Sequence, residues 1–260
     1  MNKMDAIVTA GGIPQPDEPL YPYTQGISKA LLDIAGKPMI QWVLDALCEA
    51  ETIEHIVIVG LPEGSDLNCI KIGGYLPNQG GMLSNLKAGI IKVYEINPNT
   101  SHVLLVSSDI PTINAEMVNW VVNTALQTDE DAYYNVITRQ VMETRFPESK
   151  RTYTHFKDMD VCGGDMNVVR AAISADDELW EKIIAARKSP LKQASLLGFD
   201  TLLLMLLRMI TLEGAVKRVT KRVGLTGRAL ICPYAEIGMD VDKPNQLELV
   251  RTDIASRLAV

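Results

Sequence analysis

The sequence is poor in cysteine, and its few cysteines form no motif. The four cysteines in 260 residues are Cys48, Cys69, Cys162 and Cys232. No two of them stand in C-x-x-C spacing, and no histidine lies at a metal-binding spacing from them. This pattern excludes a disulfide scaffold and a zinc ribbon. We therefore expect reduced thiols that mostly pack in the interior of a cytoplasmic protein.

The sequence also lacks a membrane-spanning run and an excess of positive charge. Its most apolar stretch, Thr201–Ile210, is about half as long as a membrane span and contains Arg208. The N-terminal residues show no signal-peptide pattern. The formal net charge is −7, whereas nucleic-acid-binding proteins present basic surfaces to phosphate backbones. We therefore expect no transmembrane segment and no nucleic-acid partner.

What the sequence does have is a series of continuous apolar strands that alternate with amphipathic helices. The predicted strands are residues 5–12, 55–61 and 102–111, and the predicted helices are residues 39–50, 80–96 and 114–127. This alternation indicates βαβ units and a parallel sheet. We predict a single α/β domain over residues 1–260, with a three-layer, Rossmann-like, mostly parallel sheet and helices on both faces. Ligands of such folds bind at the carboxyl ends of the strands.

Two segments depart from this pattern. Residues 131–171 alternate polar and apolar side chains between turn residues, so we expect β-ribbons there that cover the acceptor side of a site. Residues 177–227 are expected to form a helical insertion. Within it, residues 187–228 carry nine basic side chains and two acidic ones, a net charge of +7 that leaves −14 on the rest of the chain.

The segment 195–225 has an apolar first half and a basic second half. Lys217, Arg218, Lys221 and Arg222 share one helix face at this spacing. Such a face attracts phosphorylated acceptors, or an anionic lipid surface in a peripheral membrane contact. A helical subdomain with packed leucines and a solvated basic face explains the same pattern. The segment could also form a homodimer contact.

Two glycines and a lysine near the N-terminus suit a phosphate-binding loop. A strand that ends in Gly11 and Gly12 lets backbone N–H groups approach a ligand, although an ordinary tight turn would use the same residues. The pattern is neither a Rossmann fingerprint nor a P-loop. Lys29 could place a positive charge on a phosphate, or it could be a solvated lysine before a helix. Lys37, in "GKP", is expected to be structural.

Carboxylates stand after an apolar strand and near the C-terminus. Asp109 directly follows the strand, where it could bind a divalent metal or cap the helix that begins near Asn114. Asp240 and Asp242, near the other end of the chain, are further candidate ligands for a divalent metal. Asp242 could complete the metal site, or it could cap a terminal helix whose first turn suits Pro244. Mg²⁺ on nucleotide phosphates takes one or two carboxylates, so Asp109 and Asp242 would suffice.

The order of these motifs resembles that of a known family. The segments "AGG", "SKALLDIAGKPMI", "GGMLSNLKAGI", "SSDIP" and "DVDKPNQLELV" follow one another along the chain. This order is similar to that of the MobA-like NTP transferases and, more loosely, of sugar-1-phosphate nucleotidyltransferases and cytidylyltransferases. The resemblance covers about residues 4–128 and 229–256. It implies the GT-A type of the predicted fold and a nucleotidyltransferase activity.

The resemblance also implies roles for individual residues. Lys29 and Asp109 would be the catalytic residues, with Lys29 neutralising the phosphates of an incoming NTP. Asp109 and Asp242 would bind Mg²⁺. The residues implied for nucleotide binding are Ala10, Gly11, Gly12, Gly81 and Ser84. The residues implied for contact with the acceptor are Gly163, Gly164 and Asp165.

One departure concerns the loop after the glycines. The family's loop usually carries an arginine that grips the triphosphate, but no Arg or Lys stands between Gly12 and Lys29. We expect Mg²⁺-dependent transfer of an NMP from an NTP to a small phosphorylated acceptor, such as a sugar or polyol phosphate, with release of pyrophosphate. The alternative is a non-catalytic nucleotide or nucleotide-sugar binding module. A GT-A glycosyltransferase would usually show D-x-D where this strand ends in "SSD".

Overall fold

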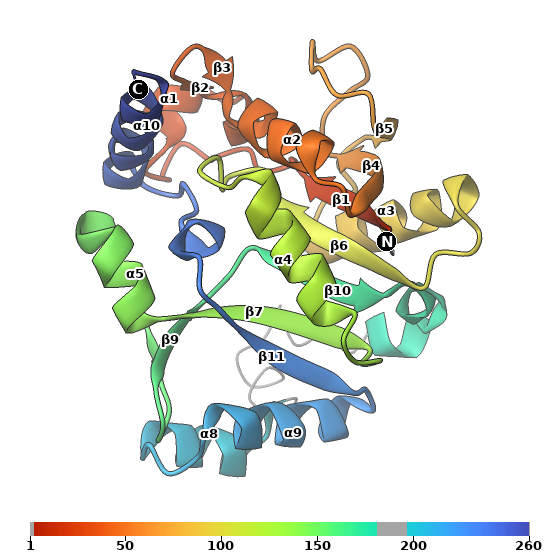
Figure 1. The fold of residues 1–260 in the computed structure, drawn as a ribbon, viewed down its shortest axis with the longest axis vertical. Coiled ribbons are helices and arrows are strands. Elements are labelled where there is room, and N and C mark those ends of the chain that lie inside the picture. Colours follow the sequence, from red (N-terminus) through yellow and green to blue (C-terminus); the bar gives the residue numbers. More distant parts are fainter. Residues whose placement is uncertain (1–2, 181–196, 260) are drawn as a thin grey trace.

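A central mixed sheet organises the chain. The computed structural model describes residues 3–180 and 197–259. Within these residues the sheet has nine strands in the order β5-β4-β1-β6-β10-β7-β9-β8, with β11 paired to β7 (Figure 1). Helices lie against it on both sides. The predicted α/β, Rossmann-like architecture is therefore confirmed.

The first half of the sheet is parallel. Its strands are β1 (Met4–Thr9), β4 (Ile53–Val59), β5 (Ile72–Leu76) and β6 (His102–Ser107). β1 lies between β4 and β6 and pairs with both in parallel. Because its two faces are both buried, Ala6 and Val8 join one apolar cluster while Ile7 joins the other. This double burial explains the continuous apolar sequence of the strand. β5, which carries two glycines, is a strand that we did not predict.

Four long helices cover the two faces. They are α2 (Met39–Glu49), α3 (Met82–Ile96), α4 (Ala115–Ala125) and α10 (Pro244–Leu258). α2, α4 and α10 contribute to the larger apolar cluster, and α3 contributes to the smaller one on the other face. The predicted cap of α4 is confirmed, because the Asn114 side chain accepts a hydrogen bond from the Met117 N–H at 3.0 Å.

The second half of the sheet is largely antiparallel and corrects one prediction. Its strands are β7 (Ala132–Thr138), β8 (Thr154–His155), β9 (Asp160–Gly163), β10 (Met166–Arg170) and β11 (Gly227–Cys232). The β-ribbon predicted over residues 131–171 is wrong for Arg139–Arg145, which form helix α5. The helix begins there because the Thr138 side chain accepts from the Val141 N–H at 3.3 Å. β7 and β10 also belong to the central sheet rather than to a separate ribbon.

The remaining elements are short. They are α1 (Tyr21–Thr24), β2 (Asp33–Ile34), β3 (Lys37–Pro38) and the 3₁₀ turns η1 (Lys29–Leu31), η2 (Pro147–Ser149), η3 (Ala171–Ala175) and η4 (Ala235–Gly238). The cysteines Cys48, Cys69, Cys162 and Cys232 are all free thiols, as expected. No helix among the described residues is long and apolar enough to cross a membrane.

The predicted helical insertion is described only in part, because residues 181–196 lie outside the described residues. Its described helices are α8 (Phe199–Leu206) and α9 (Leu212–Val223), which lie beside β11 (Figure 1). Phe199, Leu203 and Leu206 are more than half exposed. On the basic face, Arg218 and Arg222 both form ion pairs with Asp200. Contacts of this segment with a membrane or with a second copy stay predictions.

Gly60 offers a test of how β4 supports the glycine loop after β1. Its φ is +111°, and a Cβ there would lie 2.2 Å from the backbone nitrogen of Gly11. Gly60→Ala should lower the free energy of unfolding by about 2 kcal/mol or more. The new methyl group would overlap the backbone of Gly11, and an alanine is strained at this positive φ. Gly36→Ala is the matched control, since φ is +87° there and no atom lies within 4 Å of the new Cβ. Urea unfolding that gives equal losses for both variants would contradict this account.

Candidate functional site

The loop after β1 is closed at its base by two hydrogen bonds. The Ser28 hydroxyl donates to the carbonyl of Ala10 at 2.6 Å, and the Lys29 backbone N–H donates to the carbonyl of Gly12 at 2.9 Å. The same Ser28 oxygen caps η1 by accepting from the Ala30 N–H at 3.3 Å. The loop therefore starts at the glycine pair and closes back on it at Lys29, as the sequence suggested. Ser28 is a site residue that the sequence analysis missed.

A polar turn before α3 packs against the same glycines. Asn78 donates to the carbonyl of Gly11 at 2.9 Å, and a Cβ at Gly11 would lie 3.0 Å from side-chain atoms of Asn78 and Asn85. Gly81 is the N-cap of α3, and the half-buried Ser84 lies in its first turn. The structure thus brings the predicted glycine loop and the predicted α3 turn together. The two asparagines were missed, although polar residues that flank a glycine pair are a usable signal.

Lys29 joins two carboxylates that are far apart in the sequence. Its Nζ lies 2.6 Å from Asp109 Oδ2 and 2.5 Å from Asp242 Oδ1. Burial by itself would lower the pKa of Lys29, but the charges of Asp109 and Asp242 outweigh it and raise the pKa above its usual value. The ammonium group therefore stays charged in ordinary buffers. One cation bridges the two carboxylates at the carboxyl end of the sheet.

Three alternatives from the sequence can now be judged. Asp109 does not cap α4, because Asn114 does. Asp242 does not cap α10, whose N-cap is Lys243 and makes no side-chain capping bond, while Pro244 takes the first turn as predicted. Lys37 is structural as expected, because it forms a 2.8 Å ion pair with Asp45 and lies over the Trp42 ring.

Asp109 has the chemistry of a metal ligand. One of its oxygens binds Lys29, whereas Oδ1 is buried and has no hydrogen-bond partner among the described residues. Leaving a buried carboxylate oxygen unpaired is costly, so a ligand that can use it would be stabilised. A hard divalent cation such as Mg²⁺ prefers carboxylate oxygens. Asp109 and the exposed Asp242 therefore fit a metal whose other ligands come from phosphate and water.

The segment predicted to touch the acceptor lies beside this cluster. Gly163 ends β9, and Asp165 begins the return into β10, where its carbonyl accepts from the Ser107 N–H at 2.9 Å. That bond ties Asp165 to the end of β6, just before Asp109. Gly164 lies close to η4, since a Cβ there would be 3.0 Å from Ile237. The structure therefore places all three predicted acceptor residues at the same edge of the sheet.

Asp165 is held in an unusual electrostatic setting. Burial, aided by the negative charges of Asp109 and Asp242, raises its pKa to about 7, although the cations Arg151 and Lys29 act in the opposite direction. Arg151 also forms an ion pair with Asp240. Asp240 is thus occupied by an arginine, and Arg151 is another site residue that the sequence analysis missed.

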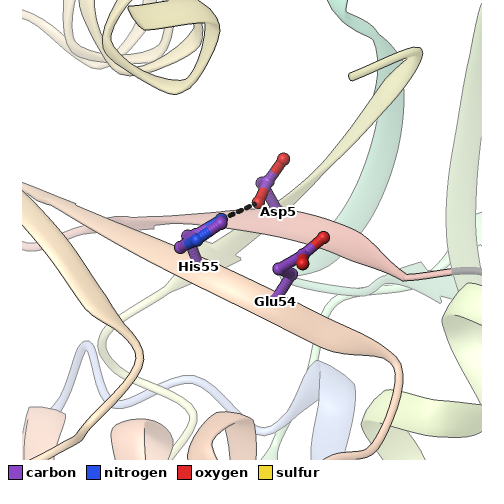
Figure 2. Close-up of side chains that lie close together, drawn as sticks. All are labelled: Asp5, Glu54 and His55. Atoms are coloured by element: carbon purple, nitrogen blue, oxygen red, sulfur yellow. Dashed lines mark hydrogen bonds and ion pairs between the residues drawn. The ribbon is translucent and has the colours of Figure 1, made fainter. Parts of the chain in front are cut away.

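A second cluster of polar side chains lies at the opposite end of the strands, near the starts of β1 and β4. Figure 2 shows Asp5, Glu54 and His55, the one group of three or more metal-ligating residues within mutual reach in residues 3–180 and 197–259. The buried Asp5 is already satisfied, because it contacts His55 Nδ1 at 2.9 Å and accepts from Asn97 at 2.9 Å. These hydrogen bonds give the cluster a structural role at the start of β1 and β4.

The fold and the site together define an α/β protein with a glycine loop, a bridging lysine and two carboxylates at the carboxyl edge of its sheet. The sequence matches the model of the MobA-like NTP transferase domain over residues 21–191. The chain belongs to this family, which confirms the resemblance and makes it a nucleotidyltransferase. No curated protein matches the chain significantly.

Solved structures share the fold. The structure of a hypothetical transferase from Thermus thermophilus is 32% identical, with 94% of this chain and 99% of that chain covered and a TM-score of 0.79. A 4-diphosphocytidyl-2C-methyl-D-erythritol synthase from Anaerococcus prevotii is 13% identical, with 98% and 96% covered and a TM-score of 0.59. A CMP:2-keto-3-deoxy-manno-octonic acid synthetase complexed with CTP is 14% identical, with 99% and 100% covered and a TM-score of 0.54. At these identities the two synthases show the fold alone.

The pKa of Asp165 predicts a pH dependence of stability. Because its pKa is near 7 in the folded chain and 3.8 ordinarily, the folded state binds an extra proton between about pH 4 and 7. Stability should therefore fall as the pH rises through that window, by about 1.4 kcal/mol for each unit of pKa shift. Asp165→Asn should remove this loss when urea unfolding is measured from pH 5 to 8 in chelator. The control Asp17→Asn changes an exposed carboxylate and should show the same pH dependence of stability as wild type. If Asp165→Asn also shows the wild-type pH dependence, the raised pKa of Asp165 is contradicted.

Proposed function

We propose that the chain transfers a nucleoside monophosphate from an NTP to a small phosphorylated acceptor and releases pyrophosphate. A sugar or polyol phosphate is the acceptor class that we expect. The observation that carries the proposal is the bridge from Lys29 to Asp109 and Asp242, which lies directly beside Gly12. The glycine loop contacts that bridge at Gly12, the α3 turn packs against the neighbouring Gly11, and the acceptor-side segment is bonded to the end of β6 just before Asp109.

The glycine loop and the α3 turn would hold the nucleotide. Ala10, Gly11 and Gly12 supply backbone groups without side chains in the way, and Gly81 and Ser84 begin a helix whose free N–H groups favour negative charge. Asn78 and Asn85 fix the two segments against each other. The nucleotide therefore meets a preformed surface, and little ordering is needed when it binds.

The reaction needs no covalent enzyme intermediate. An oxygen of the acceptor phosphate attacks the α-phosphorus, and a new P–O bond forms as the bond to the leaving pyrophosphate breaks. The pyrophosphate carries away the electron pair of that bond, so no proton has to be moved. Lys29 stabilises the negative charge that builds up on the phosphates, and its raised pKa keeps it protonated.

Asp109 and Asp242 would hold Mg²⁺, which supplies further neutralisation of phosphate charge. The unpartnered Asp109 Oδ1 supports this assignment. On the acceptor side, Gly163, Gly164 and Asp165 lie beside the half-buried Arg151. A phosphorylated acceptor suits an arginine, because the guanidinium group can bind phosphate oxygens through two donors.

A second candidate function is a non-catalytic nucleotide or nucleotide-sugar binding module. The observation that favours it is the loop between Gly12 and Lys29, which has no cation and carries Asp17 and Glu18.

Calorimetric titration separates the two functions. A thermal-shift screen of NTPs with Mg²⁺ should come first, since a bound ligand raises the melting temperature by mass action. CTP heads that screen because the CMP:2-keto-3-deoxy-manno-octonic acid synthetase, which shares the fold, was solved as a complex with CTP. Binding without turnover over a panel of acceptors would favour the module.

Asp109→Ala tests the proposed activity. The variant should lower pyrophosphate release by at least about 100-fold, because it removes a carboxylate that would hold the Mg²⁺ that neutralises phosphate charge in the transition state. The melting temperature should stay close to that of wild type, since Lys29 keeps its partner Asp242. Asp17→Ala, which changes an exposed carboxylate in the loop, is the matched control and should stay active. Full activity of Asp109→Ala would refute the proposal.

A further inference from the structure

The loop that follows the glycines covers a pocket with an unusual charge pattern. The cavity has a volume of about 430 Å³, and its lining includes Gly12, Ile13 and Pro14 from the loop together with Lys29, Asp242 and Lys243. The loop itself contributes no cation to this cavity but does contribute Glu18. A ligand with several negative charges would need positive side chains from elsewhere in the chain.

Lys29 and Lys243 are the two cationic residues that line the cavity. Lys29 is already bound to Asp109 and Asp242, so most of its charge is matched within the protein. Lys243 is exposed and makes no ion pair or side-chain hydrogen bond with any other described residue. It is therefore the cation in the cavity that remains free to meet a ligand.

The backbone fixes Lys243 at the mouth of the cavity. Lys243 is the N-cap of α10, and its carbonyl accepts hydrogen bonds from the Gln246 and Leu247 N–H groups at 3.0 Å. The Gln246 side chain accepts in turn from the Asp242 N–H at 3.0 Å. Lys243 thus follows directly on the Asp242 that binds Lys29. The start of a 15-residue helix adds a partial positive charge beside it.

We propose that Lys243 binds the β- and γ-phosphates of the NTP and the pyrophosphate that leaves. It takes the place of a cation that the loop lacks, and it distinguishes a triphosphate from a monophosphate at this site. The inference rests on the proposed function, because it assumes that the α-phosphate lies at Lys29. Glu18 is held towards its own loop, where its carboxylate accepts from the Gln15 N–H at 2.6 Å.

The test compares the binding of phosphates of different length to variants of Lys243. Lys243→Ala should weaken the binding of NTP and of inorganic pyrophosphate with Mg²⁺ by about tenfold or more, the effect of losing a charged hydrogen-bond donor. Binding of the corresponding NMP should not change, and Lys243→Arg should restore the wild-type affinity for pyrophosphate. The measurement is isothermal titration calorimetry, with melting temperatures to confirm that each variant folds.

Lys3→Ala is the matched control. Lys3 is also an exposed lysine, but it directly precedes β1, at the opposite end of that strand from the glycine loop. This control should bind all three ligands as wild type does. If Lys243→Ala binds NTP and pyrophosphate like the control while wild type turns over NTP, the role of Lys243 is refuted and the proposed function stands. If Lys243→Ala weakens the binding of NMP as much as that of NTP, the role of Lys243 in binding the β- and γ-phosphates is also refuted. If wild type binds neither NTP nor pyrophosphate, both proposals fail together.

Discussion

The site depends on one electrostatic constraint, the bridge of Lys29 between Asp109 and Asp242. Two carboxylates at the same end of the sheet repel each other, and the ammonium group that lies within 2.6 Å of both removes that repulsion. The bridge also joins the start of the chain, the end of β6 and the start of α10. A site assembled from three distant segments is thereby held in one arrangement before any ligand binds. A triphosphate with its metal would meet a preorganised set of charges.

The sheet explains why these segments meet. β1 and β6 are parallel neighbours, so their carboxyl ends lie side by side and deliver Gly11 and Asp109 to the same edge. The antiparallel strand β10 starts at that edge and brings Asp165 with it. Gly60 completes the arrangement from β4, because its lack of a side chain leaves room for the loop at Gly11. Backbone register therefore brings the site residues together, and their side-chain chemistry supports the proposed function.

Local pattern was enough to predict the α/β class, and it named candidate site residues that the fold brings to one end of the sheet. A continuous apolar run predicts a strand that is buried on both faces. A glycine or aspartate directly after it marks the end of the strand where a ligand can bind. The sequence could not reveal helix α5, because one capping bond from Thr138 decides it. It also could not show that Arg151 binds Asp240, or that Lys243 lines the cavity beneath the loop, since these contacts depend on tertiary packing between segments far apart in the chain.

The central claim is that Lys29 serves bound phosphates as well as the two carboxylates. The most direct test is NTP turnover and NTP binding by Lys29→Ala, with wild type measured alongside and both proteins checked for folding. The account predicts that turnover is lost and that NTP affinity falls by about tenfold or more, since a charge-assisted contact to phosphate disappears. A folded Lys29→Ala variant that binds and turns over NTP as wild type does would contradict it.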